Sequence, residues 1–347
     1  MGGGAYSASA HFFDENADMP KFPSRLAKVI AASALAAVAV SASALAAQAP
    51  AAQPGSAVAA APAIPQMRTR LMTSLTGYEV SEYLKRNDVL YVPVGPTEVN
   101  GGAPTDVEYV IPLAYAIKLA EKSDGLVMPY LAYFYPGGTT TSPATVQVST
   151  SESLPYLKAL TRSLIRQGFR RIVFLTSHGP SPATMLPLVR ETFDELHVPV
   201  LWMDTGMVRK VEPGEQRPGF GGGPPNGRNL TIFGAYQLVG RLGDIPVGLS
   251  QPKHEIVRDP SNLSRFVPPY NGTPAGSFYA DPAEHGGFVE AITEEQRAAW
   301  GKEGAAMIEA QVASFDALGI LGALRKRDEF TRQLEAKYGD LLPGARK

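Results

Sequence analysis

Four short apolar runs alternate with longer amphipathic segments along the chain, and this alternation predicts the fold class. Each run is rich in β-branched and aromatic residues and lacks the polar alternation of a one-sided sheet, which predicts buried strands at 88–95, 125–133, 170–177 and 198–204. Helical periodicity covers residues 106–122, 152–168, 182–196, 231–242 and 293–338. Strands that alternate with helices are typical of a mainly parallel sheet covered on both faces, so the pattern predicts an α/β protein.

A long segment between the fourth strand and the following helix has no periodicity. Residues 211–229 read VEPGEQRPGFGGGPPNGRN and are too rich in glycine and proline for a helix or strand. A loop of this length in a compact domain is usually a lid, a binding loop or an oligomer contact.

The N-terminal part of the chain has the organisation of an exported protein. We interpret residues 1–18 as a non-native or misannotated start, 19–47 as a signal peptide with a small-residue cleavage pattern, 48–66 as a disordered Ala/Pro linker, and 67–347 as one domain that ends in helices. The apolar part of the signal spans only about a dozen residues, against the ~20 that cross a bilayer. The expected location is therefore periplasmic or secreted, with no stable membrane anchor after cleavage.

Net charge and cysteine content argue against a nucleic-acid-binding protein and against a disulfide-stabilised one. The formal net charge is -1, so no basic excess favours nucleic acid, and the absence of cysteine excludes a disulfide framework. The expected partner is a small-molecule substrate.

Acidic and imidazole side chains follow two of the predicted strands. Glu98 and Asp106 come after the strand at 88–95, and His178 follows the strand at 170–177. Loops at the carboxyl ends of parallel strands meet in one crevice, and two carboxylates with one imidazole suit zinc or manganese. Structural roles remain open, because Thr105 and Glu108 fit a capping box at the start of the next helix, Glu98 fits a solvated loop, and His178 fits a backbone hydrogen bond.

Several stretches together resemble the creatininase (creatinine amidohydrolase) family. They are VLYVPVGPTEVNGG, the aspartate at the head of the next helix, SPATVQVS, GFRRIVFLTSHGP and YADPAEHGG, and they follow one another in the family's order over most of residues 70–310. The resemblance implies a three-layer α/β/α domain, a two-metal hydrolase site that opens C–N bonds, and a homo-oligomer. By position, Glu98, Asp106 and His178 match three metal ligands.

Two positions depart from the family pattern. The family's histidine two residues after the glutamate is Asn100 here, and the acidic ligand two residues after the strand-end histidine is Pro180. Neither is a good ligand for zinc, so we expect one divalent ion, zinc or manganese, rather than two.

The sequence therefore predicts an exported metal-dependent hydrolase that cleaves an amide, lactam or cyclic amide C–N bond. Glu98 and His178 are the expected catalytic residues, Glu98, Asp106 and His178 the metal ligands, and Asn100, Tyr135 and Asn229 the substrate-binding residues. His285 and the pair His254-Glu255 are lesser candidates for a further ligand or a proton-transfer group. The alternative is a catalytically impaired family member that acts as a periplasmic binding or assembly protein.

Overall fold

A computed structural model describes the folded part of the chain. The described residues are 65–210, 227–250 and 291–344, with a few further positions, namely 260, 261, 263, 275–278, 285 and 289. The expected non-native start, signal peptide and nearly all of the expected linker lie outside them, as do residues 211–226 of the predicted loop and the His254-Glu255 pair. Among the described helices none is long and apolar enough to cross a membrane alone, although one bent pair, Glu294–Ser314 with Ala317–Leu341, meets the length and composition criteria together.

A parallel sheet of four strands forms the centre of the described structure. The strands are β1 (Val89–Pro93), β2 (Leu126–Val127), β3 (Arg171–Thr176) and β4 (Leu201–Asp204), in the order β2-β1-β3-β4. Every pair is parallel, with Leu90 opposite Leu126 and Ile172, and Val173 opposite Leu201. The predicted parallel α/β fold is thus confirmed.

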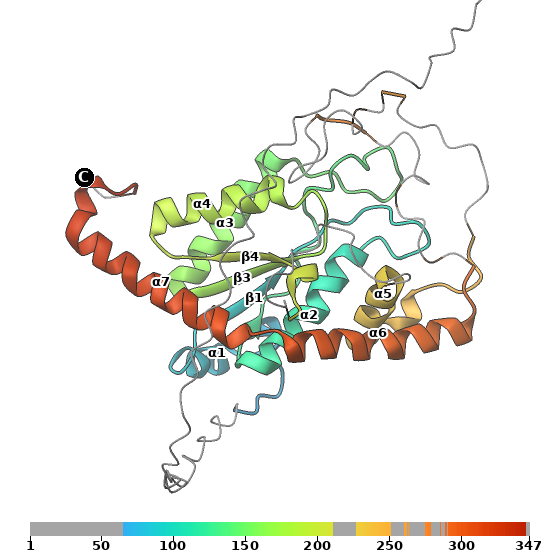
Figure 1. Ribbon diagram of the computed structural model, residues 1–347, viewed down its shortest axis with the longest axis horizontal. Coiled ribbons are helices and arrows are strands. Elements are labelled where there is room, and N and C mark those ends of the chain that lie inside the picture. The colour runs from blue at the N-terminus through green and yellow to red at the C-terminus, as the bar shows by residue number, and fades with distance from the viewer. Residues whose placement is uncertain are drawn as a thin grey trace, which may run out of the picture. The chain divides into compact units, whose positions relative to one another are not determined.

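Helices cover both faces of this sheet (Figure 1). One layer contains α1 (Gly77–Leu84), α3 (Thr150–Gln167) and α4 (Pro182–Leu196), and the other contains α2 (Val107–Ser123), α5 (Gly227–Leu238), α6 (Glu294–Ser314) and α7 (Ala317–Tyr338). Short 3-10 helices lie at Met72–Ser74, Thr205–Met207, Leu242–Asp244 and Gly339–Leu341. Alternate β1 residues face opposite layers: Leu90 and Val92 pack with the first, Val89 and Tyr91 with the second.

Three elements differ from the expectations of the sequence. The strand predicted at 125–133 is regular only over Leu126–Val127, with an isolated parallel bridge from Leu131 to Val94, since Pro129 follows and Tyr130 takes a positive φ of 76°. The long C-terminal helix is two helices, because the chain breaks at residues 315–316 and the Asp316 side chain caps α7 by accepting from the Gly319 N–H. Helix α1 was not predicted, although Thr76 and Glu79 form a capping box at its start.

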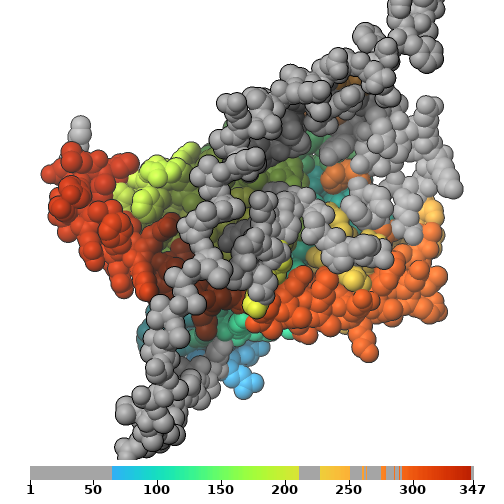
Figure 2. Space-filling view, viewed as in Figure 1, coloured from blue at the N-terminus to red at the C-terminus, as the bar shows by residue number. Residues whose placement is uncertain are grey.

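Helices α5 and α6 cross at very close range through two glycines. A Cβ atom placed on Gly304 would lie 1.9 Å from the Leu230 carbonyl oxygen, and one on Gly234 would lie 2.2 Å from the Gly304 carbonyl carbon. Helix α6 is exposed on its outer side along the lower edge of the face in Figure 2. The crossing fixes α5 against α6, and α5 carries residues that reach the candidate site.

Candidate metal site

Loops after neighbouring strands place two candidate residues at the carboxyl edge of the sheet. Glu98 follows β1, and His178 follows β3, which is the direct neighbour of β1. Both side chains are buried. The parallel arrangement therefore brings together two residues that lie 80 positions apart in the chain, as the sequence predicted for strand-end loops.

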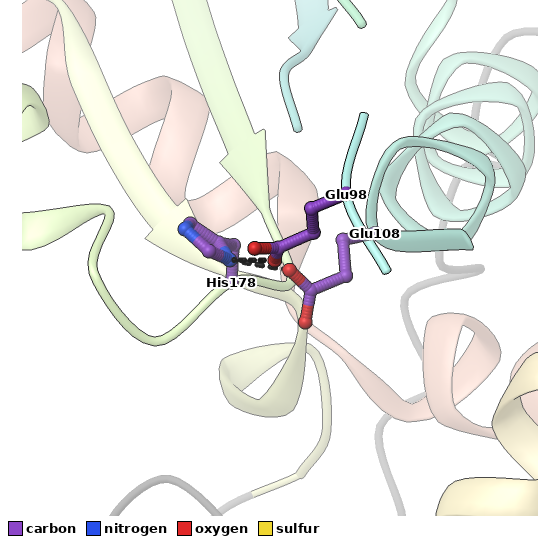
Figure 3. Close-up of side chains that lie close together, drawn as sticks. All are labelled: Glu98, Glu108 and His178. Carbon is purple, nitrogen blue, oxygen red and sulfur yellow. Dashed lines mark hydrogen bonds and ion pairs between the residues drawn. The ribbon is translucent and has the colours of Figure 1, made fainter. Parts of the chain in front are cut away.

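Glu108 completes a buried cluster with these two residues (Figure 3). Ligand atoms of Glu98, Glu108 and His178 all lie within 4.8 Å of one another. Nδ1 of His178 hydrogen-bonds to Oε2 of Glu108 and lies 3.2 Å from Oε1 of Glu98. On its other side, Nε2 of His178 lies 3.0 Å from the carbonyl oxygen of Tyr135.

Glu108 enters the cluster because α2 begins unusually close to β1. A Cβ atom on Gly95 would lie 2.3 Å from the Glu108 carbonyl oxygen, so only glycine allows the first turn of α2 to lie against the end of β1. The capping box considered for Thr105 and Glu108 is not formed: Asp106 is the N-cap of α2 and makes no side-chain cap hydrogen bond. The Glu108 carboxylate points into the cluster instead.

Burial and mutual attraction set the protonation of the cluster. Burial raises the pKa of Glu98 to about 7, and the nearby His178 only partly opposes this. Burial alone would raise the pKa of Glu108 too, but the charge and hydrogen bond of His178, with Arg228, hold it well below its usual range. Burial alone would lower the pKa of His178, yet Glu108 and Glu98 raise it to about 10. Without an ion, the cluster therefore holds a proton on His178 next to an ionised Glu108.

These residues fit a divalent ion. The carbonyl of Tyr135 can accept a hydrogen only from Nε2–H, which leaves Nδ1 of neutral His178 as the nitrogen that faces both carboxylates. Oε1 of Glu98 is buried and has no hydrogen-bond partner among the described residues, while Oε2 accepts a hydrogen bond from Thr139. A divalent ion would replace the proton between these groups and would have three protein ligands, the number that a catalytic zinc site uses when water or substrate is the fourth.

Asp106, a predicted metal ligand, is placed outside this cluster by the structure. Its Oδ1 accepts a hydrogen bond of 2.6 Å from the Tyr236 hydroxyl, and its Oδ2 lies 2.6 Å from Nη1 of Arg241. Both partners come from α5 or directly after it, so the Asp106 carboxylate ties the start of α2 to α5. Glu108, two residues later, takes the position that the sequence assigned to Asp106.

The three predicted substrate-binding residues lie in different settings. Asn100 is buried, and neither polar atom of its side-chain amide has a partner among the described residues. Tyr135 contacts His178 through its backbone carbonyl. Asn229 lies in the first turn of α5, with a buried Oδ1 that has no partner within the described structure. Buried amide atoms without a partner are suited to hydrogen bonds with a substrate. The substrate-binding role of Asn100, Tyr135 and Asn229 stays a prediction.

Two further residues belong to the surroundings of the cluster. His285 contacts the loop that follows β1, with Nδ1 2.7 Å from the carbonyl oxygen of Val99. Asp204, which the sequence analysis missed, ends β4; burial raises its pKa to about 6, and the charges of Glu108, His178 and Arg228 also act on it. Its position at the carboxyl end of a strand is the same signal that identified Glu98 and His178.

Metal affinity is expected to rise with pH. Glu98 and His178 must lose their protons to bind an ion, and their raised pKa values of about 7 and about 10 mean that both compete with metal at pH 6. The apparent affinity for Zn²⁺ or Mn²⁺ should increase roughly 10-fold per pH unit near pH 8, where one proton is released, and more steeply below pH 7. Calorimetric titration in buffers of different ionisation enthalpy measures both quantities. A pH-independent affinity without proton release would contradict this protonation scheme.

Comparison with known sequences relates this chain to two hydrolases. Residues 73–222 match the family model described as creatininase, creatinine amidohydrolase. A 3-dehydro-scyllo-inosose hydrolase of Thermotoga maritima is 30% identical over 142 residues, which cover 40% of this chain and 45% of the relative. A creatinine amidohydrolase of Pseudomonas putida is 32% identical over 96 residues, which cover 26% and 37% of the two chains. The chain thus spans less than half the length of the curated relatives it matches.

Solved structures support the same fold over a larger part of the chain. A creatinine amidohydrolase crystal structure superposes with a TM-score of 0.51 at 18% identity and covers 78% of this chain and 99% of that one. A manganese form of creatininase gives a TM-score of 0.50 at 20% identity, with 75% and 98% covered. A zinc–zinc form of a creatininase mutant gives the same TM-score, identity and coverage.

Proposed function

Because the chain belongs to the creatininase family, we propose that it is a metal-dependent hydrolase that cleaves a C–N bond in a small molecule. The observation that carries the proposal is the buried cluster of Glu98, Glu108 and His178, whose atoms lie within 4.8 Å of one another. Two related structures are a manganese form and a zinc–zinc form, which supports one of these metals here. The fold alone would not support an activity, since one fold hosts many functions.

Each residue of the cluster has a defined task in this proposal. Glu98, Glu108 and Nδ1 of His178 hold the ion, which would supply Lewis acidity for a carbonyl oxygen and for water. The Tyr135 carbonyl orients the His178 ring, and Thr139 orients Glu98. Asn100 and Asn229 offer unpartnered amide atoms to the substrate.

His285 is the proposed proton-transfer group. The Val99 carbonyl can only accept, so Nδ1 of His285 must donate the hydrogen of their 2.7 Å hydrogen bond. In the neutral ring this makes Nε2 the basic nitrogen. Val99 directly follows the candidate ligand Glu98, which supports a proton-transfer role for His285 in a reaction that needs a general base.

A second substrate class is supported by one of the sequence relatives. The 3-dehydro-scyllo-inosose hydrolase matches a longer stretch of this chain than the creatinine amidohydrolase does.

Substitution of family ligand positions by Asn100 and Pro180 supports a further possibility, a binding protein without catalysis. The experiment below separates these three outcomes.

The test is metal-dependent turnover of a defined substrate panel. The full chain is stripped with a chelator, reloaded with Zn²⁺ or Mn²⁺, and assayed with creatinine, hydantoin and 3-dehydro-scyllo-inosose. Turnover of a C–N substrate that is lost on stripping and restored on reloading supports the proposal, and turnover of the inosose alone supports the second class. Tight metal binding with no turnover of any compound would favour the binding protein, and failure to bind metal would remove the hydrolase proposal.

We also propose that the protein is exported and forms a homo-oligomer in solution. Export is supported by Lys21, Arg25 and Lys28 before an apolar segment that ends in Ala44-Leu45-Ala46. Mass spectrometry of the protein from the native extracytoplasmic fraction should find an N-terminus near Ala47; an intact N-terminus there would contradict cleavage of the signal, and absence of the protein from that fraction would contradict export. Light scattering of the purified protein should give a mass above one chain.

A further inference from the structure

Arg228 shares a carboxylate with the candidate metal site. It lies in the first turn of α5, and its Nη2 lies 3.2 Å from Oε1 of Glu108. The other oxygen of the same carboxylate, Oε2, faces His178. Figure 3 shows these two oxygens turned to different sides, one toward the imidazole and one away from it. Glu108 therefore bridges the position expected for an ion and a guanidinium that is always charged.

A third carboxylate lies within range of this guanidinium. Oδ1 of Asp204 accepts the Gly206 N–H at 2.8 Å, while Oδ2 is buried and has no partner among the described residues. Glu108, His178 and Arg228 each act electrostatically on Asp204. The end of β4 thus adds a third acidic group whose charge is coupled to the cluster and to Arg228.

The charges of these groups balance with one ion and not with two. Glu98, Glu108 and Asp204 carry three negative charges when ionised, and neutral His178 adds none. One divalent ion together with Arg228 neutralises them. Two divalent ions together with Arg228 would leave an excess of two positive charges in a site whose glutamates and histidine are buried, and uncompensated buried charge is strongly unfavourable.

We propose that Arg228 is a fixed second cation that limits this site to one divalent ion. The proposal rests on the metal-dependent function proposed above. The guanidinium pairs with Oε1 of Glu108, the oxygen that does not face His178, and its charge also acts on Asp204. This fixed positive charge takes the role of a second metal ion, because it already neutralises the carboxylates that such an ion would need. Its side chain is 39% exposed, so a neutral replacement need not leave a cavity in the core.

The test is metal stoichiometry in variants of the full chain, measured by elemental analysis and by calorimetric titration with Zn²⁺ and with Mn²⁺. The wild type should bind one ion per chain. Arg228→Met keeps much of the apolar stem and removes the charge, so it should bind two. Arg228→Lys keeps the charge and should bind one. Combining Arg228→Met with Asp204→Asn should return the stoichiometry to one, because a carboxylate needed by the second ion is lost.

Each other result has a defined meaning. Two ions in the wild type, or one ion in Arg228→Met, would overturn the role of Arg228 and leave the hydrolase proposal standing. A second ion in Arg228→Lys would show that the charge is not what excludes it and would also overturn the inference. A wild type that binds no ion at all would overturn both proposals. Circular dichroism of each variant establishes that the stoichiometry refers to folded protein.

Discussion

Replacement of His178 by alanine is expected to abolish metal retention and hydrolytic activity together. His178 is the only nitrogen ligand in the candidate cluster of described residues, and its Nδ1 faces both Glu98 and Glu108. Loss of residues that merely orient metal ligands typically costs roughly 10- to 100-fold in affinity or activity, so loss of a ligand should cost more. Elemental analysis after dialysis and turnover of the loaded protein measure the two effects.

Two further variants separate this effect from general damage to the protein. His178→Gln retains a neutral polar side chain in the buried site and should also lose the ion, since an amide is a poor ligand for zinc. His197→Ala is a matched control, because His197 ends α4 and contacts Glu335 and the Pro343 carbonyl instead of the cluster. It should keep full metal content. Full metal content in folded His178→Ala would refute the assignment of this residue.

Gly304→Ala is expected to be the most destabilising single-methyl change in the α5–α6 pair. The added Cβ would lie 1.9 Å from the Leu230 carbonyl oxygen, and a backbone atom cannot move aside without separating the helices. Overpacking of this kind costs about 3 kcal/mol or more, which corresponds to a fall in the melting temperature of roughly 6–12 °C for a domain of this size. Thermal unfolding followed by circular dichroism measures it.

Gly322→Ala provides the matched control in the neighbouring helix α7. No atom lies within 4 Å of the position that its Cβ would take, so the same substitution there should raise stability by about 0.5–1 kcal/mol through better helix propensity. Equal melting temperatures for Gly304→Ala and Gly322→Ala would contradict the close helix crossing. Because Tyr236 of α5 bonds Asp106 at the start of α2, the helix that carries Glu108, the Gly304 variant should bind metal more weakly as well.

The hydrophobic pattern predicted most of the fold because buried strands and amphipathic helices leave strong local signals. Strands β1, β3 and β4 and helices α2 to α4 lie close to their predicted ranges. The shortness of β2 follows from the backbone at Pro129 and Tyr130, and periodicity alone does not report it. Helix α1 could have been found from Thr76 and Glu79, whose spacing is that of a capping box.

The candidate site was only partly predictable, for a physical reason. Glu98 and His178 directly follow strands, so their meeting at one edge of a parallel sheet follows from topology. The choice between Asp106 and Glu108 depends on how α2 is rotated, and that is decided by the close approach at Gly95 and by the Asp106 contacts with Tyr236 and Arg241. Those contacts join residues 130 or more positions apart, which spacing within the chain cannot reveal.

A crystal of the full chain grown with Zn²⁺ and measured at the zinc absorption edge tests the central claim most directly. The account predicts one strong anomalous peak per chain, within coordination distance of Glu98, Glu108 and Nδ1 of His178, while Asp106 stays bound to Tyr236 and Arg241. The absence of a peak at the cluster, or an ion coordinated by Asp106 in place of Glu108, would contradict it.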